Sequence, residues 1–281
     1  MININRKRFY IAISLIILLF IIITLLYIQW PIPNPPTNSS TNIPTTTSPQ
    51  IHRVLIYDSL AREYPNVTAI KVLKNMFNEY GYEVDVYIGM NATLDPLLNL
   101  DKYSIIILRA HGAYNSDPSV NKPLGSYVYT GIYIDEAIEI YGKDYIDYMM
   151  NNNMIVLGVI PPPGATLTKE LINRLPKYIV VSPLFFIKNI KELHGSIVIF
   201  TGCYGFNDNR LAKIFVEKGA EAYISFKGNV TWSHGDAVLE ALMRTYLATH
   251  NISEAYYSLN DKLKMDLITG AELKIFLKEQ H

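Results

Sequence analysis

The chain has 281 residues, of which 49% are hydrophobic, 25 are basic, 25 are acidic and one is a cysteine. The apolar fraction excludes a wholly disordered protein, and a single cysteine excludes an internal disulfide or a zinc ribbon. Three of the basic residues, at positions 6–8, precede residue 51 and no acidic residue does. The remainder is therefore slightly acidic and offers no basic surface, so we expect no nucleic-acid partner.

The first predicted element is a helix in an uncharged apolar run from Phe9 to Trp30. About 20 apolar residues suffice to cross the hydrocarbon core of a bilayer, so residues 9–30 are predicted to form one transmembrane helix. A cleaved signal peptide is the alternative, but its apolar core is about 7–15 residues long and ends in a small-x-small site. This run instead ends in Tyr27-Ile28-Gln29-Trp30.

The basic cluster at 6–8 predicts the orientation of that helix, because positive residues favour the cytoplasmic side. Residues 1–8 are then a cytoplasmic N-terminus, and residues 31–281 are extracytoplasmic on a signal-anchored, single-pass cell-membrane protein. Residues 31–50 contain mainly Pro, Thr, Ser and Asn without apolar periodicity, and this composition predicts an extended stalk.

Residues 51–281 are long enough for one domain with a substantial core. Short β-branched runs predict strands at Val54–Tyr57, Glu83–Ile88, Ser104–Leu108, Met154–Ile160, Ile179–Val181, Ile197–Phe200 and Ala222–Phe226. Helical patterns lie at Asn66–Tyr80, Ile134–Met150, Asn207–Lys218, His234–Thr249, Ser253–Lys264 and Ala271–Lys278. Most strands are apolar on both faces, so the alternation predicts a doubly wound, mostly parallel α/β sheet preceded by the transmembrane helix.

Two further segments are predicted to belong to the functional edge of this sheet. Residues 113–130 resemble a loop, and the run of three prolines and a glycine at 161–164 breaks the chain after a strand. In open α/β sheets the ligand meets the carboxyl ends of the strands, so the residues after each apolar run are the candidates.

Two such positions carry reactive side chains, His111 three residues after Leu108 and Cys203 three residues after Phe200. If their strands are parallel neighbours, the imidazole and the thiol lie at the same edge, where a nearby imidazole favours the attacking thiolate. Gly112 frees a main-chain amide to point at a carbonyl oxygen. The amide of Cys203 is a second donor for such an oxyanion hole.

Each candidate has a structural alternative. Cysteine is among the most buried residue types, so Cys203 at the end of an apolar strand could be a core thiol. A Gly also follows His194 and His234. His194 precedes the strand that leads to Cys203 and is expected at the opposite edge of the sheet, while His234 begins a helix and is the second choice.

This combination resembles the caspase-like (clan CD) cysteine peptidases, which include caspases, gingipains, clostripain, separase and CHAT domains. The likeness covers roughly residues 100–250 and is strongest to CHAT-domain proteins over 201–247. There a cysteine turn is followed by a Gly-Ala, a Trp, an Asp and an aromatic helix end, which here are Cys203, Gly219-Ala220, Trp232, Asp236 and Tyr246. Ala110 before His111 and the triplet Thr201-Gly202-Cys203 depart from the usual family residues, and residues 113–196 match no specificity pocket.

The resemblance implies a caspase-like fold in which His111 is the general base or proton donor and Cys203 the nucleophile. It also implies that Gly112 and the Cys203 amide form the oxyanion hole. The predicted function is a membrane-anchored, extracytoplasmic thiol protease, a hydrolase that cleaves peptide or protein substrates through an acyl-enzyme. It is expected to contact the membrane through residues 9–30 and to need no cofactor or metal.

Three other functions remain open at this point. The first is a catalytically silent caspase-like module that binds a surface protein or peptide, since a fold alone does not prove activity. The second is a sugar- or nucleotide-binding domain, although no glycine-rich phosphate loop occurs. The third is a metal hydrolase, although the six histidines form neither an HExxH motif nor a His-x-His pair.

Overall fold

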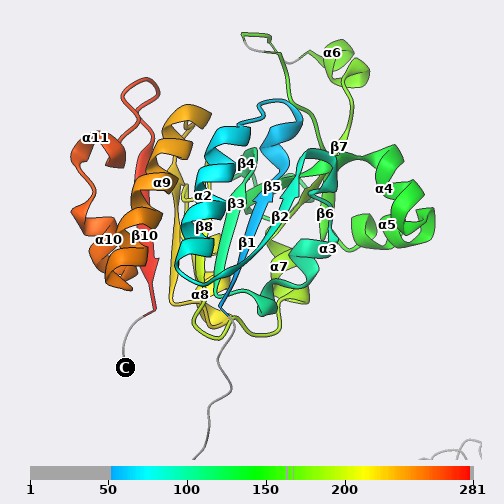
Figure 1. The fold of residues 1–281 in the computed structure, drawn as a ribbon. Coiled ribbons are helices and arrows are strands. Elements are labelled where there is room, and N and C mark those ends of the chain that lie inside the picture. Colours follow the sequence, from blue (N-terminus) through cyan, green and yellow to red (C-terminus); the bar gives the residue numbers. More distant parts are fainter. Residues whose placement is uncertain (1–51, 163, 167, 279–281) are drawn as a thin grey trace, which may run out of the picture. The chain divides into compact units, whose positions relative to one another are not determined.

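The computed structural model describes residues 52–162, 164–166 and 168–278. Their centre is a six-stranded sheet with the order β10-β9-β8-β3-β1-β2 (Figure 1). Five strands are parallel, and only the edge strand β10 runs antiparallel to its neighbour. The strands are β1 (Arg53–Asp58), β2 (Glu83–Ile88), β3 (Ile105–Arg109), β8 (Ile197–Phe200), β9 (Ala222–Lys227) and β10 (Glu272–Leu277).

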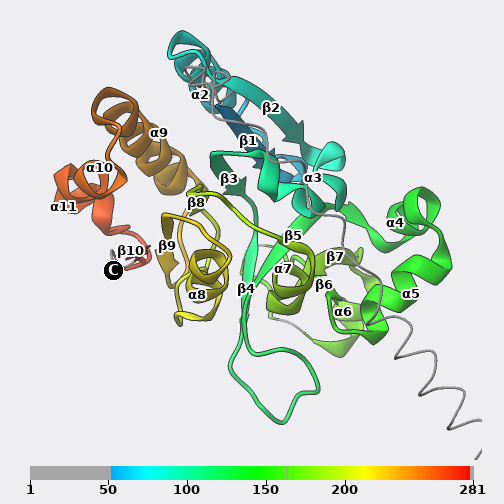
Figure 2. The ribbon, with the colours of Figure 1, turned by 90° about the horizontal axis from the view of Figure 1, so that it is seen from below.

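Helices cover both faces of this sheet because its strands are apolar on both sides. Alternate residues of β1 show the division: Val54 and Ile56 belong to one core cluster, Leu55 and Tyr57 to the other. The first cluster packs against α2 (Val67–Glu79), α9 (Trp232–Thr249) and α10 (Ile252–Ser258). The second packs against α7 (Pro183–Asn189) and α8 (Arg210–Glu217), on the other side of the sheet (Figure 2).

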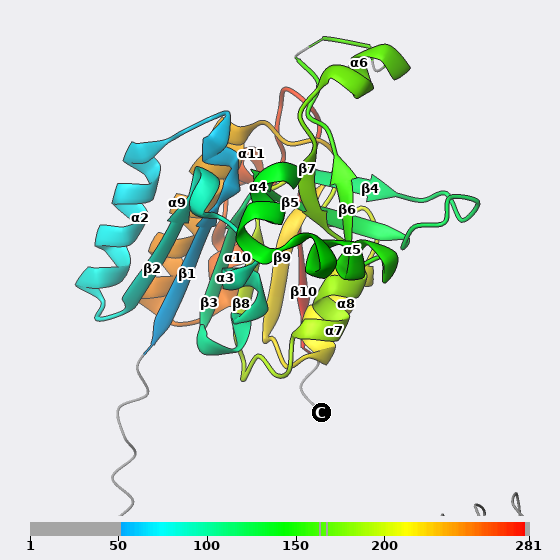
Figure 3. The same cartoon turned by 90° about the vertical axis from the view of Figure 1, so that its right-hand side faces the viewer.

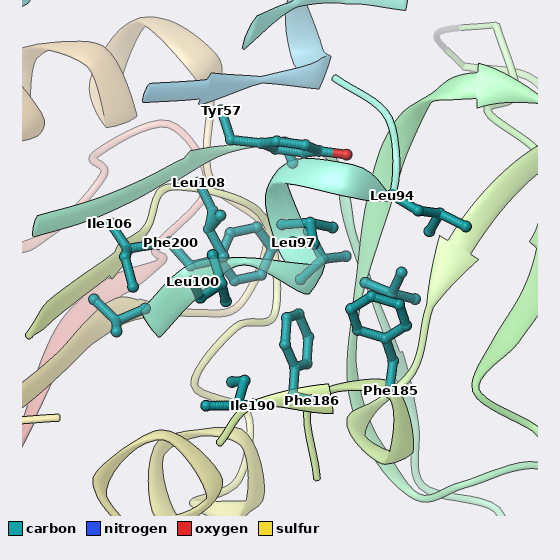
Figure 4. Close-up of a cluster of buried hydrophobic side chains, with 14 of the residues drawn as sticks. Tyr57, Leu94, Leu97, Leu100, Ile106, Leu108, Phe185, Phe186, Ile190 and Phe200 are labelled. Carbon is teal, nitrogen blue, oxygen red and sulfur yellow. The ribbon is translucent and has the colours of Figure 1, made fainter. Parts of the chain in front are cut away.

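The second cluster has an aromatic centre (Figure 4). Phe185 and Phe186 of α7 and Phe200 of β8 are fully buried together with leucines from the segment that leads into β3. Burying one such side chain contributes about 1.5–3 kcal/mol, so this layer fixes α7 and β8 against each other. It thereby holds the end of β8, from which Cys203 follows, at a defined position.

A second sheet with the order β4-β5-β7-β6 lies beside the first and is antiparallel throughout (Figure 3). Its strands are β4 (Gly112–Asn115), β5 (Gly125–Tyr133), β6 (Ile155–Gly158) and β7 (Tyr178–Val181). The remaining helices are η1 (Ser59–Arg62), η2 (Gly89–Asn91), α3 (Asp95–Leu98), η3 (Leu100–Lys102), α4 (Ile134–Tyr141), α5 (Lys143–Asn151), α6 (Lys169–Arg174) and α11 (Asp261–Lys264). Strand β4 begins directly after His111, so the second sheet starts beside the predicted site.

The predicted fold class, one doubly wound and mostly parallel sheet after a transmembrane helix, is wrong as stated. The described strands form two sheets, and the runs predicted at 154–160 and 179–181 pair antiparallel in the second one. Continuous apolar runs indicate burial on both faces but do not specify strand direction. None of the helices in the described part of the chain is both long and apolar enough to cross a membrane, and the predicted span 9–30 lies outside that part.

Two predicted elements also differ in type. Residues 271–278 were predicted to be helical, but 272–277 form β10, which pairs with β9; Leu273 and Ile275 pack in one core cluster and Phe276 packs against the other. That period of two outweighs the helix-favouring composition. The predicted loop at 113–130 contains most of β4 and β5. Buried hydroxyls of β5 donate hydrogen bonds to backbone carbonyls: Ser126 donates to the carbonyl of Tyr204, and Thr130 donates to that of Ile179.

The predicted helix at 134–150 is divided into α4 and α5 at Gly142, whose φ of +81° a residue with a side chain rarely adopts. The other predicted strands and helices are confirmed to within a few residues, except that 253–264 holds two short helices, α10 and α11. Gly81 and Gly219 follow helix ends with φ values of +80° and +101°, a left-handed conformation that glycine adopts readily.

Candidate functional site

A cavity of about 390 Å³ opens at the carboxyl ends of β3 and β8, and both His111 and Cys203 line it. The two strands are parallel neighbours, as predicted, and their register pairs Leu108 with Phe200. His111 and Cys203 each follow the paired residue by three positions. The sheet therefore carries the imidazole and the thiol to one edge, which is the geometrical condition for a dyad.

A larger cavity of about 810 Å³ lies at the opposite, amino-terminal end of the parallel strands. It is lined mainly by Lys and Glu side chains, including Lys191, Lys213 and Glu217, and by neither histidine nor cysteine. Size alone would select it, but the reactive side chains are in the smaller cavity. We therefore take the cavity of His111 and Cys203 as the candidate active site.

The imidazole of His111 is held between two tyrosine rings and one carboxylate. The ring centroids of Tyr64 and Tyr129 lie 5.9 and 6.0 Å from that of His111, both in edge-on orientation. Burial raises the pKa of Tyr129 to about 12, so this ring remains neutral beside the imidazole. The carboxylate is Glu63, whose Oε2 lies 3.6 Å from His111 Nε2.

Glu63 is placed to orient His111. Its Oε2 and His111 Nε2 are both buried and neither has a hydrogen-bond partner, while its Oε1 accepts a hydrogen bond from the hydroxyl of Tyr178. The separation of 3.6 Å is longer than a hydrogen bond, but unliganded catalytic contacts are often loose. Because Nε2 faces Glu63, Nδ1 is the nitrogen left to exchange a proton inside the cavity.

The thiol of Cys203 is a hydrogen-bond donor in this structure. Its Sγ lies 2.7 Å from Asn229 Oδ1 and 3.5 Å from the carbonyl oxygen of Val230. Burial raises the pKa of the Cys203 thiol above its usual value. The thiol is thus neutral at physiological pH, and a base must remove its proton before it can attack.

Gly112 is required by packing against the cysteine loop. A Cβ at this position would lie 2.0 Å from the carbonyl oxygen of Cys203 and 3.0 Å from the ring of Phe200. Two backbone segments therefore approach each other here as only a glycine allows. From the sequence, Gly112 is predicted to free a main-chain amide. The structure adds that it allows close contact between the His111 and Cys203 loops.

One wall of the cavity is a pair of stacked aromatic rings. The centroids of Tyr64 and Trp232 are 4.0 Å apart with an interplanar angle of 15°. Trp232, at the start of α9, is still 48% exposed. The same stack therefore packs on one side and presents aromatic surface on the other.

A buried ion cluster holds that wall. The guanidinium of Arg109 pairs with Asp58 at 2.7 Å and with both carboxylate oxygens of Asp236 at 2.6 and 3.0 Å. It also donates to the backbone carbonyl of Tyr64 at 3.2 and 3.3 Å. Although burial favours the neutral form of Arg109, the two carboxylates outweigh it and raise the pKa, so the residue stays charged.

The other histidines considered have structural roles or lie elsewhere. His194 precedes β8 at the opposite edge of the sheet, as expected, and its exposed side chain lies 3.6 Å from Glu192. His234 Nε2 lies 3.1 Å from the carbonyl oxygen of Leu263, and its ring packs against Phe226. Across the described ranges, no cluster of three or more His, Cys, Asp or Glu side chains has the arrangement of a metal site.

Sequence reasoning missed Glu63, Tyr64 and Asn229 as residues of this site. All three come after a strand, Glu63 and Tyr64 after β1 and η1, and Asn229 after β9, but their position after a strand does not single them out from the other residues there. Among the residues quoted for the CHAT likeness, Trp232 lines the cavity and Asp236 belongs to the ion cluster behind it.

In comparisons with known proteins, no family model matches the chain, and no curated protein matches it.

Proposed function

We propose that this protein is a cysteine peptidase of the caspase-like type, with Cys203 as nucleophile and His111 as base. The single observation that carries the proposal is the shared cavity, which both residues reach from equivalent positions on neighbouring parallel strands. The resemblance of the His-Gly and Cys-x-Gly strand ends to that clan supports the same assignment.

The chemistry begins with the neutral thiol. Nδ1 of His111 takes the proton of Cys203 as Sγ attacks the carbonyl carbon of a peptide bond, and a C–S bond forms. The negative charge that develops on the carbonyl oxygen is stabilised by the main-chain amides of Gly112 and Cys203. Breaking of the C–N bond then releases the amine, which receives the proton from His111, and leaves a thioester on Cys203.

Water completes the cycle. His111 removes a proton from the water molecule that attacks the thioester carbon, and the thiol leaves with that proton as the acid product departs. Glu63 acts as a positioning residue in both halves, because a carboxylate facing Nε2 orients the ring and stabilises the imidazolium that forms in each half.

Labelling of Cys203 tests this proposal directly. The full chain is incubated with peptidyl epoxides or chloromethylketones, and the adduct is located by mass spectrometry. We expect modification of Cys203 in the native protein, a loss of that modification in Cys203→Ala, and a labelling rate lower by about 100-fold in His111→Ala. Hydrolysis of peptide substrates should likewise be fastest for the wild type, much slower for His111→Ala and absent for Cys203→Ala. A Cys203 that resists every peptidyl probe, or reacts independently of His111, contradicts the proposal.

A second function, a silent module that binds a peptide or surface protein, is favoured by one observation. Cys203 donates to Asn229 and Val230 rather than to a base, and burial raises its pKa. If the protein is such a module, the wild type and Cys203→Ala bind peptides equally well, and neither hydrolyses them. Peptide binding by both proteins without turnover in the wild type would select this function.

A further inference from the structure

We propose that the cavity accepts an uncharged aromatic or large aliphatic side chain, so that the enzyme cleaves peptides next to such residues and not next to Asp, Glu, Lys or Arg. This inference rests on the proposed function, because it names the substrate class of the same site. It concerns the residue whose carbonyl carbon Cys203 attacks.

The first argument is the chemistry of the lining. The described lining residues include no Asp, Glu, Lys or Arg. The side chains that surround His111 and Cys203 are mainly apolar or aromatic, with threonines and one asparagine as the polar members; they include Leu60, Tyr64, Ile160, Val230 and Trp232. Transfer of an unpaired charged side chain into such a cavity is costly, whereas an apolar one gains from burial.

Second, the charged groups that the structure describes near the cavity already have contacts within the protein. Arg109 is fully engaged by Asp58, Asp236 and the carbonyl of Tyr64. Asp266 is buried and accepts hydrogen bonds from the amides of Thr231 and Ile268. Glu63 contacts His111 and Tyr178, so each charged group described around the cavity is already held by a contact within the protein.

The third argument is shape. A volume of about 390 Å³ lies at the small end of the range for ligand cavities, about 300–1,000 Å³, and suits one large side chain with its backbone. The half-exposed ring of Trp232 offers a flat surface on which an aromatic side chain stacks, and such ring pairs add about 0.5–1.5 kcal/mol beyond burial.

The rim continues the same apolar surface. Thr269 lines the cavity, and the loop that carries it also presents Leu267 and Ile268, which are 74% and 82% exposed. Apolar side chains with this exposure beside a cavity are typical of a surface that contacts a ligand. A substrate with apolar residues near the cleaved bond therefore finds complementary surface both inside and beside the cavity.

The test uses the full chain and four tetrapeptide acyloxymethylketones that differ only in the residue next to the reactive group: Phe, Leu, Asp or Arg. We measure the second-order rate of Cys203 labelling for each by mass spectrometry. The Phe and Leu probes should react at least about tenfold faster than the Asp and Arg probes, because the charged side chains lose hydration without gaining a partner.

Variants at the wall and the rim sharpen the result. Trp232→Ala should lower the rate of the Phe probe about three- to tenfold, while the matched control Tyr257→Ala, an exposed aromatic residue on α10, should leave it unchanged. Thr269→Lys should raise the ratio of Asp-probe to Arg-probe labelling up to about fivefold, because it introduces a cation at the rim. A retained circular dichroism spectrum shows that each variant is folded.

The outcomes separate the two proposals. Faster labelling by the Asp or Arg probe that still depends on His111 overturns the substrate class and leaves the peptidase intact. Equal rates for all four probes, again dependent on His111, also overturn the substrate class. Absence of labelling by every probe, or labelling that is indifferent to His111→Ala, removes the peptidase and the substrate class together.

Discussion

Replacing Arg109 with Met should destabilise the folded domain more than any change at the surface. Arg109 is 1% exposed and lies between two carboxylates, Asp58 at 0% and Asp236. Methionine fills much of the same space but leaves both carboxylates without a cation. Removing one side of a buried ion pair costs about 3–5 kcal/mol, so we expect a loss of this size in the free energy of unfolding.

The same change should strengthen the local pH dependence. Burial already raises the pKa of Asp58, and the charge and hydrogen bond of Arg109 offset part of that rise. Without Arg109 the folded-state pKa rises further above the unfolded value of about 3.9. A raised folded-state pKa means that stability is present below the unfolded pKa and is lost as pH rises through the folded one. Arg109→Met should therefore recover part of its loss as pH falls from 7 toward 4.

Urea unfolding followed by circular dichroism, at pH 7 and at pH 5, measures both effects. The matched control is Arg244→Met on α9, where Arg244 pairs with Glu240 at 2.8 Å but both side chains are exposed. Exposed pairs contribute about 0–1 kcal/mol, and no added pH dependence of stability is expected there. The triple variant Arg109→Met, Asp58→Asn, Asp236→Asn should recover much of the stability. The reasoning is refuted if Arg109→Met costs no more than Arg244→Met.

Three further changes test other parts of the site. Glu63→Gln should lower kcat by about 10- to 100-fold with KM little changed, because His111 loses its orientation but no substrate contact is removed; an equal rise in KM would point to a binding role. Gly112→Ala places a Cβ 2.0 Å from the Cys203 carbonyl oxygen, and should cost about 1–3 kcal/mol in a thermal or urea melt and suppress labelling of Cys203; a variant with wild-type stability and labelling would show that the loops do not need this contact. Burial opposes ionisation of Asp266, but hydrogen bonds from backbone amides outweigh it and lower the pKa to about 2. That lowered pKa contributes about 2 kcal/mol to the free energy of unfolding above pH 4, and this contribution is lost as pH falls toward 2. Asp266→Asn should therefore be less stable than wild type at pH 7 and equal to it near pH 2. A difference in stability that persists at low pH contradicts this assignment.

The positions of His111 and Cys203 were predictable from local pattern. Both follow strongly apolar strands, and the carboxyl ends of parallel strands meet at one edge, so the two residues share an edge provided that their strands are parallel neighbours. The register of β3 and β8 agrees with that inference. Gly112 was also found, although the structure adds a contact with the Cys203 loop that no spacing argument contains.

The partners of those residues were not predictable in the same way. Glu63 is 48 positions before His111, and Arg109 reaches Asp236 across 127 positions. A Glu or Asp after a strand has many possible roles, and only the packing of η1 and the start of α9 against the strand ends selects one. The uncharged lining described for the cavity likewise depends on which charged side chains pair with one another outside it, and that pairing is set by the folded structure.

The sequence by itself determined most of the apolar strands, the helices between them, and the placement of a histidine and a cysteine directly after two of those strands, because periodicity and strand ends are local properties. The tertiary structure alone decided that the strands divide between a mostly parallel and an antiparallel sheet, since apolar runs record burial but not direction. It also decided that residues 272–277 form an edge strand, because pairing with β9 supplies backbone hydrogen bonds that outweigh a weak helix preference.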